Sequence, residues 1–164
     1  MSEIYADILK QARVQEPESV RVLCDLVRTP SFSTKEQAVI ERIRKEMLSG
    51  GFDEVRVDGL GNVIGRVGSG PRLIAFDAHV DTVEAGDRSQ WSFDPFERRI
   101  SEGRVWGRGA ADQKGGLASM VYAGDIILEL GLDRGLSLLF IGSVIIIFVL
   151  ILKISVSLAQ TLAP

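Results

Sequence analysis

His79 and Asp81 stand two residues apart in the segment Phe76–Asp81, and His79 is the only histidine of the 164-residue chain. A neutral imidazole is a good ligand for Zn²⁺, and a nearby carboxylate can orient or polarise the ring. The run Arg72–Asp77 is short, apolar and preceded by Gly70-Pro71, which predicts a buried β-strand. Open α/β sheets build their sites beyond the carboxyl ends of such strands. Because a single histidine is more often structural than a ligand, the pair needs support from a second motif.

That second motif is Val105–Gly116, in which a glycine-rich loop leads to Asp112 and then to a predicted helix. The glycines let the backbone pass close to a bulky or charged group. Asp112 as the N-cap of the helix remains an alternative to Asp112 as a metal ligand. A dinucleotide-binding loop fits less well, because Asp112 replaces the last glycine of that fingerprint and would repel a pyrophosphate. The helix is predicted from apolar residues at helical spacing with a glycine C-cap: Leu117, Met120, Val121, Ile127, Leu128 and Gly131.

Together the two motifs resemble the co-catalytic zinc metallopeptidase family of acetylornithine deacetylase, succinyl-diaminopimelate desuccinylase, aminoacylase and glutamate carboxypeptidase. The resemblance covers roughly residues 17–144 and is supported by Asp58–Gly65, a hairpin ahead of the metal strand, and by Trp91–Phe96. It implies a mixed α/β fold of the zinc-exopeptidase type, with a mixed sheet, flanking helices and the site at the carboxyl ends of the strands.

The resemblance also implies a role for each candidate residue. His79 would ligate one metal, Asp112 would bridge two, and Asp81 would act at the catalytic site by orienting His79. The cofactor would be a pair of Zn²⁺ ions, with Co²⁺ or Mn²⁺ as alternatives. In that family a bridging water attacks an amide carbonyl of an N-acyl amino acid or small peptide, and a glutamate is its general base.

The sequence departs from the family after its next predicted strand, Leu136–Val144. Two ions about 3.5–4 Å apart need roughly three protein ligands each, and the family supplies them with a Glu-Glu pair, a further carboxylate and a second histidine. Here Ile145–Leu152 follows the strand, and no Asp or Glu occurs after Asp133. The general base, several ligands and the family's dimerisation domain are therefore missing, so we expect a truncated, catalytically incomplete form with incompletely bound metal.

The apolar run 135–152 supports two interpretations. It is uncharged and close to the shortest helix that spans a bilayer, about 17–18 residues, which would attach the protein to a membrane. Its Val, Ile and Phe content also suits a strand, and a frameshifted C-terminus explains the loss of charges and ligands together. We therefore divide the chain into residues 1–144, the N-terminal part of a zinc-hydrolase catalytic domain, and residues 145–164, an atypical apolar tail.

Composition bears on the possible binding partners and on the cellular location of the protein. The net charge of −3 and the absence of a basic stripe argue against nucleic-acid binding. Cys24 is the one cysteine and is expected to be a buried core residue. Because no basic-then-apolar leader opens the chain, the expected location is cytoplasmic, with membrane association through 135–152 as the alternative.

The front of the chain predicts helices followed by short strands. Ile4–Leu9 suggests one amphipathic helix, and a second is expected to begin near Pro17, bury Cys24 and end before Pro30. A third should begin with a capping box, Ser33-x-x-Glu36 or Thr34-x-x-Gln37, and end at Gly50-Gly51. Its buried face should hold Val39, Ile40, Ile43 and Met47. The strands are expected at 54–57, 62–67 and 72–76.

Three functional hypotheses follow. The first is a zinc-dependent amidohydrolase or metallopeptidase of which this chain is an incomplete form. The second is a membrane-attached protein without catalysis that keeps the first half of the fold. The third is a weak mononuclear metal-binding module that uses His79, Asp81 and Asp112 alone.

Overall fold

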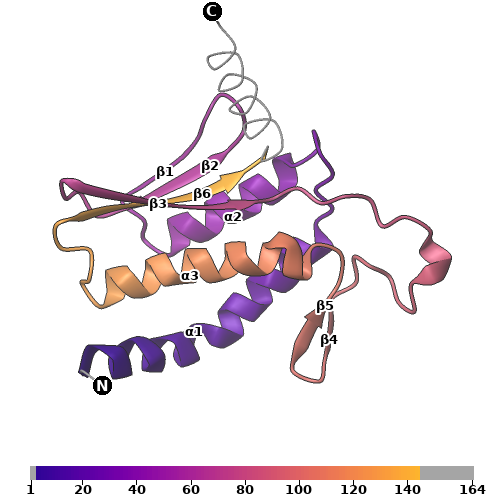
Figure 1. Cartoon of the computed structure of the whole chain (residues 1–164), viewed down its shortest axis with the longest axis horizontal. Coiled ribbons are helices and arrows are strands. Elements are labelled where there is room, and N and C mark those ends of the chain that lie inside the picture. Colours follow the sequence, from indigo (N-terminus) through magenta and orange to yellow (C-terminus); the bar gives the residue numbers. More distant parts are fainter. Residues whose placement is uncertain (1–2, 145–164) are drawn as a thin grey trace, which may run out of the picture.

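A computed structural model describes residues 3–144 of the chain. Two long helices pack against a four-stranded sheet, a third long helix packs on one of these helices, and a two-stranded hairpin lies apart from the sheet (Figure 1). The mixed α/β class predicted from the sequence is confirmed. The elements in chain order are α1 (Glu3–Arg28), α2 (Gln37–Ser49), β1 (Glu54–Val57), β2 (Val63–Val67), β3 (Arg72–His79), the 3₁₀ helix η1 (Arg88–Gln90), β4 (Arg99–Ser101), β5 (Arg104–Trp106), the π-helical turn η2 (Ala110–Lys114), α3 (Gly115–Glu129) and β6 (Leu136–Ser143).

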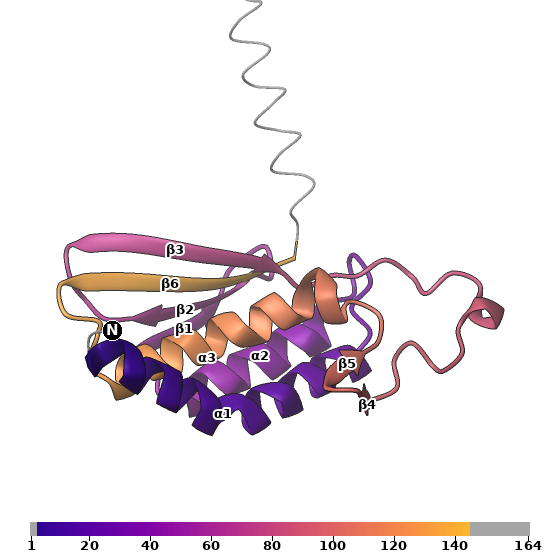
Figure 2. The same cartoon turned by 60° about the horizontal axis from the view of Figure 1, so that its bottom comes forward.

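The sheet is mixed and has the order β1-β2-β6-β3. β6 runs antiparallel to β2 and parallel to β3, in a register that pairs Arg72 with Leu136 and His79 with Ser143. The parallel pair brings the carboxyl ends of β3 and β6 to the same edge of the sheet. α1, α2 and α3 all lie on one face of the sheet (Figure 2), so the described residues form two layers.

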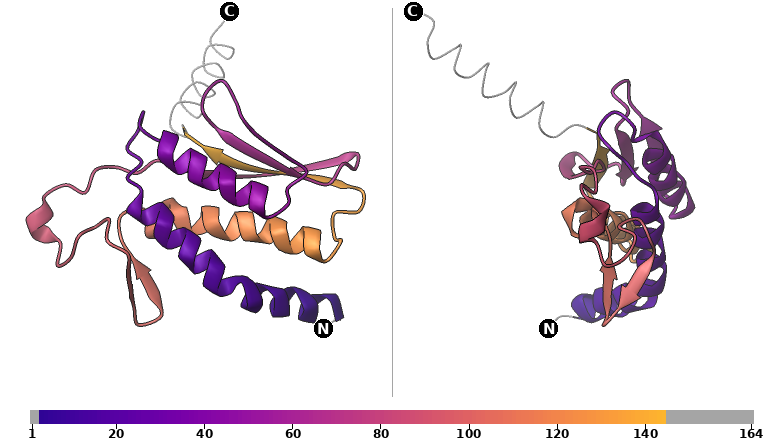
Figure 3. Two further views of the ribbon diagram at one scale, coloured as in Figure 1. Left: turned by 180° about the vertical axis from the view of Figure 1, so that it is seen from behind. Right: turned by 90° about the vertical axis from the view of Figure 1, so that its right-hand side faces the viewer.

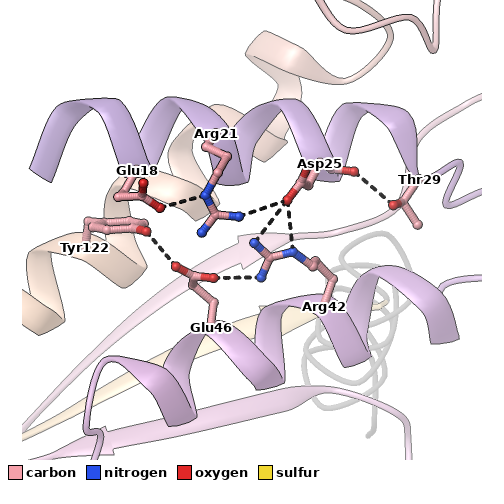
Figure 4. A network of polar contacts seen from close by, with 7 residues as sticks. All are labelled: Glu18, Arg21, Asp25, Thr29, Arg42, Glu46 and Tyr122. Atoms are coloured by element: carbon pink, nitrogen blue, oxygen red, sulfur yellow. Dashed lines mark hydrogen bonds and ion pairs between the residues drawn. The ribbon is translucent and has the colours of Figure 1, made fainter.

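The core lies between that face and the helices. The predicted buried face of α2 is confirmed, since Val39, Ile40, Ile43 and Met47 are all buried. α3 approaches the sheet closely at Gly124, where an added Cβ would stand 3.2 Å from the ring of Phe140 on β6. On the outer side a polar network joins α1, α2 and α3 (Figure 4). Its members are Glu18, Arg21, Asp25, Thr29, Arg42, Glu46 and Tyr122.

The two helices predicted at the N-terminus are one continuous helix, so that prediction is wrong. Pro17 lies inside α1. Proline interrupts the helical hydrogen-bond ladder and causes a kink, and the axis of α1 bends near its middle (Figure 3). Solvent around the exposed Pro17 can hydrate the freed carbonyl, so the helix continues. The buried residues of α1, including Cys24 as predicted, lie in its second half.

The predicted capping box at the start of α2 is also wrong. Glu36 stands at the N-cap without a side-chain capping bond, and its carboxylate accepts the Thr34 N–H at 2.7 Å. The Ser33 hydroxyl instead donates to Asp81 Oδ2 at 3.0 Å. The reason is tertiary, because Phe32 forms a parallel bridge with Thr82 and draws this segment toward the end of β3.

β3 was predicted to be a buried strand, and this too needs correction. Its side chains are mostly exposed, with Leu73 at 64%, Ile74 at 44% and Phe76 at 43%. Among the described residues β3 pairs with β6 alone, so its outer edge has no partner there. An apolar run predicts a strand but not the number of its neighbours. The β4–β5 hairpin was not predicted, although its turn at Glu102-Gly103 has the positive φ values of a tight hairpin turn.

The apolar run 135–152 is not a single helix, because Leu136–Ser143 forms β6 as the strand interpretation predicted. None of the helices in residues 3–144 combines the length and the apolar character needed to cross a membrane. The expectations for the tail, residues 145–164, lie outside the described residues.

Candidate metal centre

His79 is the last residue of β3, where the sheet presents its ring at the edge formed by the carboxyl ends of β3 and β6. Its backbone N–H donates to Gln113 Oε1 at 3.2 Å. Its ring Nδ1 lies 3.2 Å from Asp81 Oδ1 and 3.1 Å from the Asp81 carbonyl oxygen. The His79 side chain is 20% exposed, so one edge of the ring remains accessible.

Asp112 reaches that accessible edge from the loop before α3. Its Oδ1 lies 3.0 Å from His79 Nε2, and its side chain is 88% exposed. The backbone at Asp112 is not helical, with φ −127° and ψ 91°, which turns the carboxylate away from the axis of α3. His79, Asp81 and Asp112, to which the family resemblance gave roles in one site, therefore do lie together. The N-cap alternative for Asp112 is wrong, because Lys114 holds that position without a side-chain capping bond.

This arrangement fits part of a metal centre. Two ligand atoms that each lie about 2 Å from one ion are roughly 3–4 Å apart, and His79 Nε2 and Asp112 Oδ1 are separated by 3.0 Å. Asp81 occupies the other ring nitrogen, where carboxylates commonly orient metal-binding histidines. Within residues 3–144, however, no group of three or more His, Cys, Asp or Glu side chains is arranged to hold an ion. The residues present supply two ligands and one orienting carboxylate.

The electrostatics of the site favour a cation at His79. Burial of the ring lowers the pKa of His79, but the hydrogen bond to Asp112 raises it, as does the proximity of Asp81. The net pKa therefore lies above its ordinary value. The same two carboxylates that stabilise a positive charge on the ring would also favour a metal cation beside it.

A residue that sequence reasoning missed, Ser31, holds the segment after β3 in place. Ser31 is fully buried, and its hydroxyl donates to the Val80 carbonyl at 2.7 Å. The Ser31 carbonyl in turn accepts the Thr82 N–H at 2.8 Å. Asp81 stands between these two contacts. A serine before a predicted helix suggests a cap, so the sequence gives no signal for this role.

Lys114, also missed, holds the Asp112 loop. It is fully buried, and its Nζ donates to the carbonyls of Leu26 and Thr29 at 2.8 Å each. Burial lowers the pKa of Lys114 to about 8. Nearby, Gly109 has a φ of +77°, and an added Cβ there would stand 2.4 Å from Thr82 Cγ2. Because lysine is almost always exposed, its residue type gives no sign of this burial.

Comparison with known proteins identifies the family of this site. The model of peptidase family M20/M25/M40 matches residues 75–143, which include His79, Asp81 and Asp112. YgeY of Escherichia coli (strain K12) is 48% identical over 137 residues, 84% of this chain and 34% of that protein. A succinyl-diaminopimelate desuccinylase of Cereibacter sphaeroides is 37% identical over 130 residues, with coverages of 76% and 34%. The chain carries part of an M20 peptidase domain. The family resemblance predicted from the sequence is confirmed.

Solved structures share the fold of this M20 domain. Human carnosine dipeptidase 1 has a TM-score of 0.72 at 21% identity, over 88% of this chain and 35% of that chain. The M20 family metallo-carboxypeptidase Sso-CP2 of Sulfolobus solfataricus has a TM-score of 0.67 at 19% identity, with coverages of 77% and 30%. YxeP of Bacillus subtilis, described as a dinuclear metal binding M20 peptidase, has a TM-score of 0.58 at 18% identity, with coverages of 79% and 35%. The chain spans about a third of the length of the curated relatives it matches.

Proposed function

We propose that this M20 domain contributes two metal ligands, His79 and Asp112, to the active site of a hydrolase that cleaves amide or peptide bonds. Residues 1–144 would be the N-terminal part of its catalytic domain. The observation that carries the proposal is the 3.0 Å approach of His79 Nε2 to Asp112 Oδ1 across a sequence separation of 33 residues. Family membership supports the reaction class, since the relatives of this chain include a succinyl-diaminopimelate desuccinylase by name.

Each side chain has a distinct role in this proposal. With Asp81 beside Nδ1 as the acceptor of its proton, the Nε2 lone pair of His79 would be available to bind a metal. Asp112 offers a carboxylate oxygen beside Nε2, and its exposed second oxygen remains free for another ion. His79 and Asp112 would hold a divalent ion, which would supply a bound water of lowered pKa and polarisation of the scissile carbonyl. We expect Zn²⁺, with Co²⁺ or Mn²⁺ as substitutes, and small peptides or N-acyl amino acids as substrates.

A second candidate function is a mononuclear metal-binding module. It is favoured by the absence of any group of three or more ligand-type side chains within residues 3–144. Two ligands hold an ion weakly, so this alternative predicts one-to-one binding that a chelator easily reverses.

Metal titration of the purified chain tests the proposal. His79 can be followed alone by NMR after ¹⁵N-histidine labelling, because the chain has one histidine. Zn²⁺ should shift the Nε2 signal, and His79→Ala should weaken binding roughly 100-fold, if the ~10–16 kcal/mol of a four-ligand zinc site is shared among its ligands. Asp112→Asn tests the second proposed ligand in the same way. Its matched control is Asp94→Asn, a change in the exposed loop before β4, which should leave binding unchanged. Zn²⁺ affinity that survives His79→Ala would refute the proposal.

A further inference from the structure

The candidate site has a strand half, His79 and Asp81 at the end of β3, and a loop half, Asp112 in the loop before α3. Both halves contact one short stretch of chain that belongs to neither. This stretch, Leu26–Ser31, contains the last turn of α1 and the residues after it, and we call it the anchor segment. It receives contacts from the end of β3 on one side and from the Asp112 loop on the other. His79 and Asp112 thus have a common support far from both in sequence.

The contact with the strand half is made through Ser31. Its hydroxyl bonds the Val80 carbonyl at 2.7 Å, and its carbonyl bonds the Thr82 N–H at 2.8 Å. These bonds fix the backbone on both sides of Asp81, whose carboxylate faces the ring of His79. Ser31 is fully buried, so water cannot easily replace either bond.

The contact with the loop half is made through Lys114, two residues after Asp112. The ammonium group binds the carbonyls of Leu26 and Thr29 at 2.8 Å each. Carbonyls in the last turn of a helix carry partial negative charge, so they suit a cation. No carboxylate within residues 3–144 forms a salt bridge with this buried ammonium.

Burying an ammonium group without an ion pair costs stability. Burial disfavours its charge, and an apolar side chain of similar volume often replaces buried ions at no cost in stability. What such a side chain cannot do is bind two carbonyls and thereby fix the position of the loop. The cost of burying Lys114 is therefore better explained by positioning than by packing.

We propose that the anchor segment sets the separation between His79 Nε2 and Asp112 Oδ1, and that Ser31 and Lys114 are the positioning residues that transmit it. This inference rests on the proposed metal centre for its functional meaning. Its geometric content, the support of the His79–Asp112 contact by Ser31 and Lys114, is testable in the metal-free protein. It assigns metal-site effects to residues that touch neither the metal nor the substrate.

The test uses Lys114→Met, Ser31→Ala and their combination in the full chain. Ser137→Ala is the matched control, because its hydroxyl donates to the Gly70 carbonyl at 2.7 Å at the opposite end of β3 and β6. The first measurement is the ¹⁵N spectrum of His79 without metal, with Asp112→Asn as the reference for a lost contact. The second is the dissociation constant for Zn²⁺. Circular dichroism and urea unfolding establish which variants fold.

Lys114→Met and Ser31→Ala should each move the Nε2 signal toward that of Asp112→Asn and weaken Zn²⁺ binding about 10-fold, the lower end of the range for partners outside the ligand shell. The loss of Zn²⁺ affinity in the double variant should be much smaller than the product of the two single losses. The reason is that both changes release the same support. Ser137→Ala should match the unmodified chain in both measurements.

Three results would overturn the inference. They are an unchanged His79 spectrum in folded Ser31→Ala, effects that multiply in the double variant, and an equal shift in Ser137→Ala. Ser31→Ala removes one hydroxyl and no charge, so it decides the question even if Lys114→Met does not fold. If the unmodified chain binds no Zn²⁺, the proposed metal centre fails, while the metal-free spectra still test the geometric inference.

Discussion

The strand half and the loop half of the candidate site are built in different ways. His79 belongs to β3, which pairs with β6 along its whole length, and the next residue, Val80, is fully buried and bonded to the Ser143 carbonyl at 2.9 Å. Asp112 lies on a loop, and its side chain is 88% exposed. The sheet therefore places one ligand through many backbone bonds, whereas a few side-chain contacts place the other. We therefore expect the backbone position of the loop to depend more on single side chains than the backbone position of the strand does.

The largest expected effect is on catalysis, which we expect the two halves of the site not to support by themselves. With Zn²⁺ or Co²⁺ added, the 164-residue polypeptide should hydrolyse N-acyl amino acids and dipeptides negligibly. Loss of a general base commonly costs about 10²–10⁴-fold in rate, and the sequence has no carboxylate after Asp133 to supply one. Release of free amine from acylated amino acids measures this. Robust metal-dependent turnover that His79→Ala abolishes would show that the two halves suffice.

Next in size is the effect of the orienting carboxylate within the strand half. Asp81→Asn keeps the shape of the side chain but weakens the acceptor at His79 Nδ1, so Zn²⁺ affinity should fall about 10–100-fold. Isothermal titration calorimetry checks this. Asp77→Asn, on the same strand, is the control and should have little effect. If the two variants bind Zn²⁺ equally well, backbone pairing alone orients the ring and Asp81 has no part in it.

The difference between the two halves also explains what the sequence could predict. The two motifs, through the family that they resemble, predicted that His79, Asp81 and Asp112 form one site, because short motifs encode ligand chemistry and local turns. Lys114 and Ser31 could not be predicted, because their partners lie about 50 to 90 residues away in sequence and their residue types suggest a solvated surface and a helix cap. For a similar reason the burial of β3 was predicted wrongly, since the number of its neighbours is a tertiary property.

The packing of the loop half can be tested at Gly109, where we expect an effect on stability of intermediate size. Gly109→Ala introduces a Cβ that would stand 2.4 Å from Thr82 Cγ2, at a φ of +77°. Gly103→Ala in the β4–β5 turn is the matched control, since it has a φ of +69° and open space around the added Cβ. Both changes carry backbone strain, so their difference isolates the clash. Gly109→Ala should lower the free energy of unfolding by about 1–2 kcal/mol more than Gly103→Ala, as measured by urea unfolding. Equal losses would mean that the loop does not pack on Thr82.

The smallest effect lies at the far end of α3 and serves as a reference for both halves. Burial raises the pKa of Asp125, and the carboxylates of Glu129 and Glu46 raise it further. Gln15 Nε2 donates to Asp125 Oδ2 at 3.2 Å, while the buried Gln15 Oε1 has no partner among the described residues. Asp125→Asn removes the charge, keeps an acceptor for Gln15 and adds an amide that can donate to Oε1.

The direction of its pH dependence follows from the raised pKa. The folded protein holds the proton on Asp125 more tightly than the unfolded chain, so stability is lost as pH rises from about 4 through the folded pKa. Asp125→Asn should therefore stabilise the fold at pH 7 by about 0.5 kcal/mol, a small value because the site is partly screened by solvent, and the gain should shrink toward pH 4. Urea unfolding at both pH values measures it, with the exposed Asp7→Asn on α1 as the control. Zn²⁺ affinity and the His79 spectrum should not change, because Asp125 contacts neither half of the site. An equal gain at both pH values would point to the new hydrogen bond rather than to relief of charge repulsion.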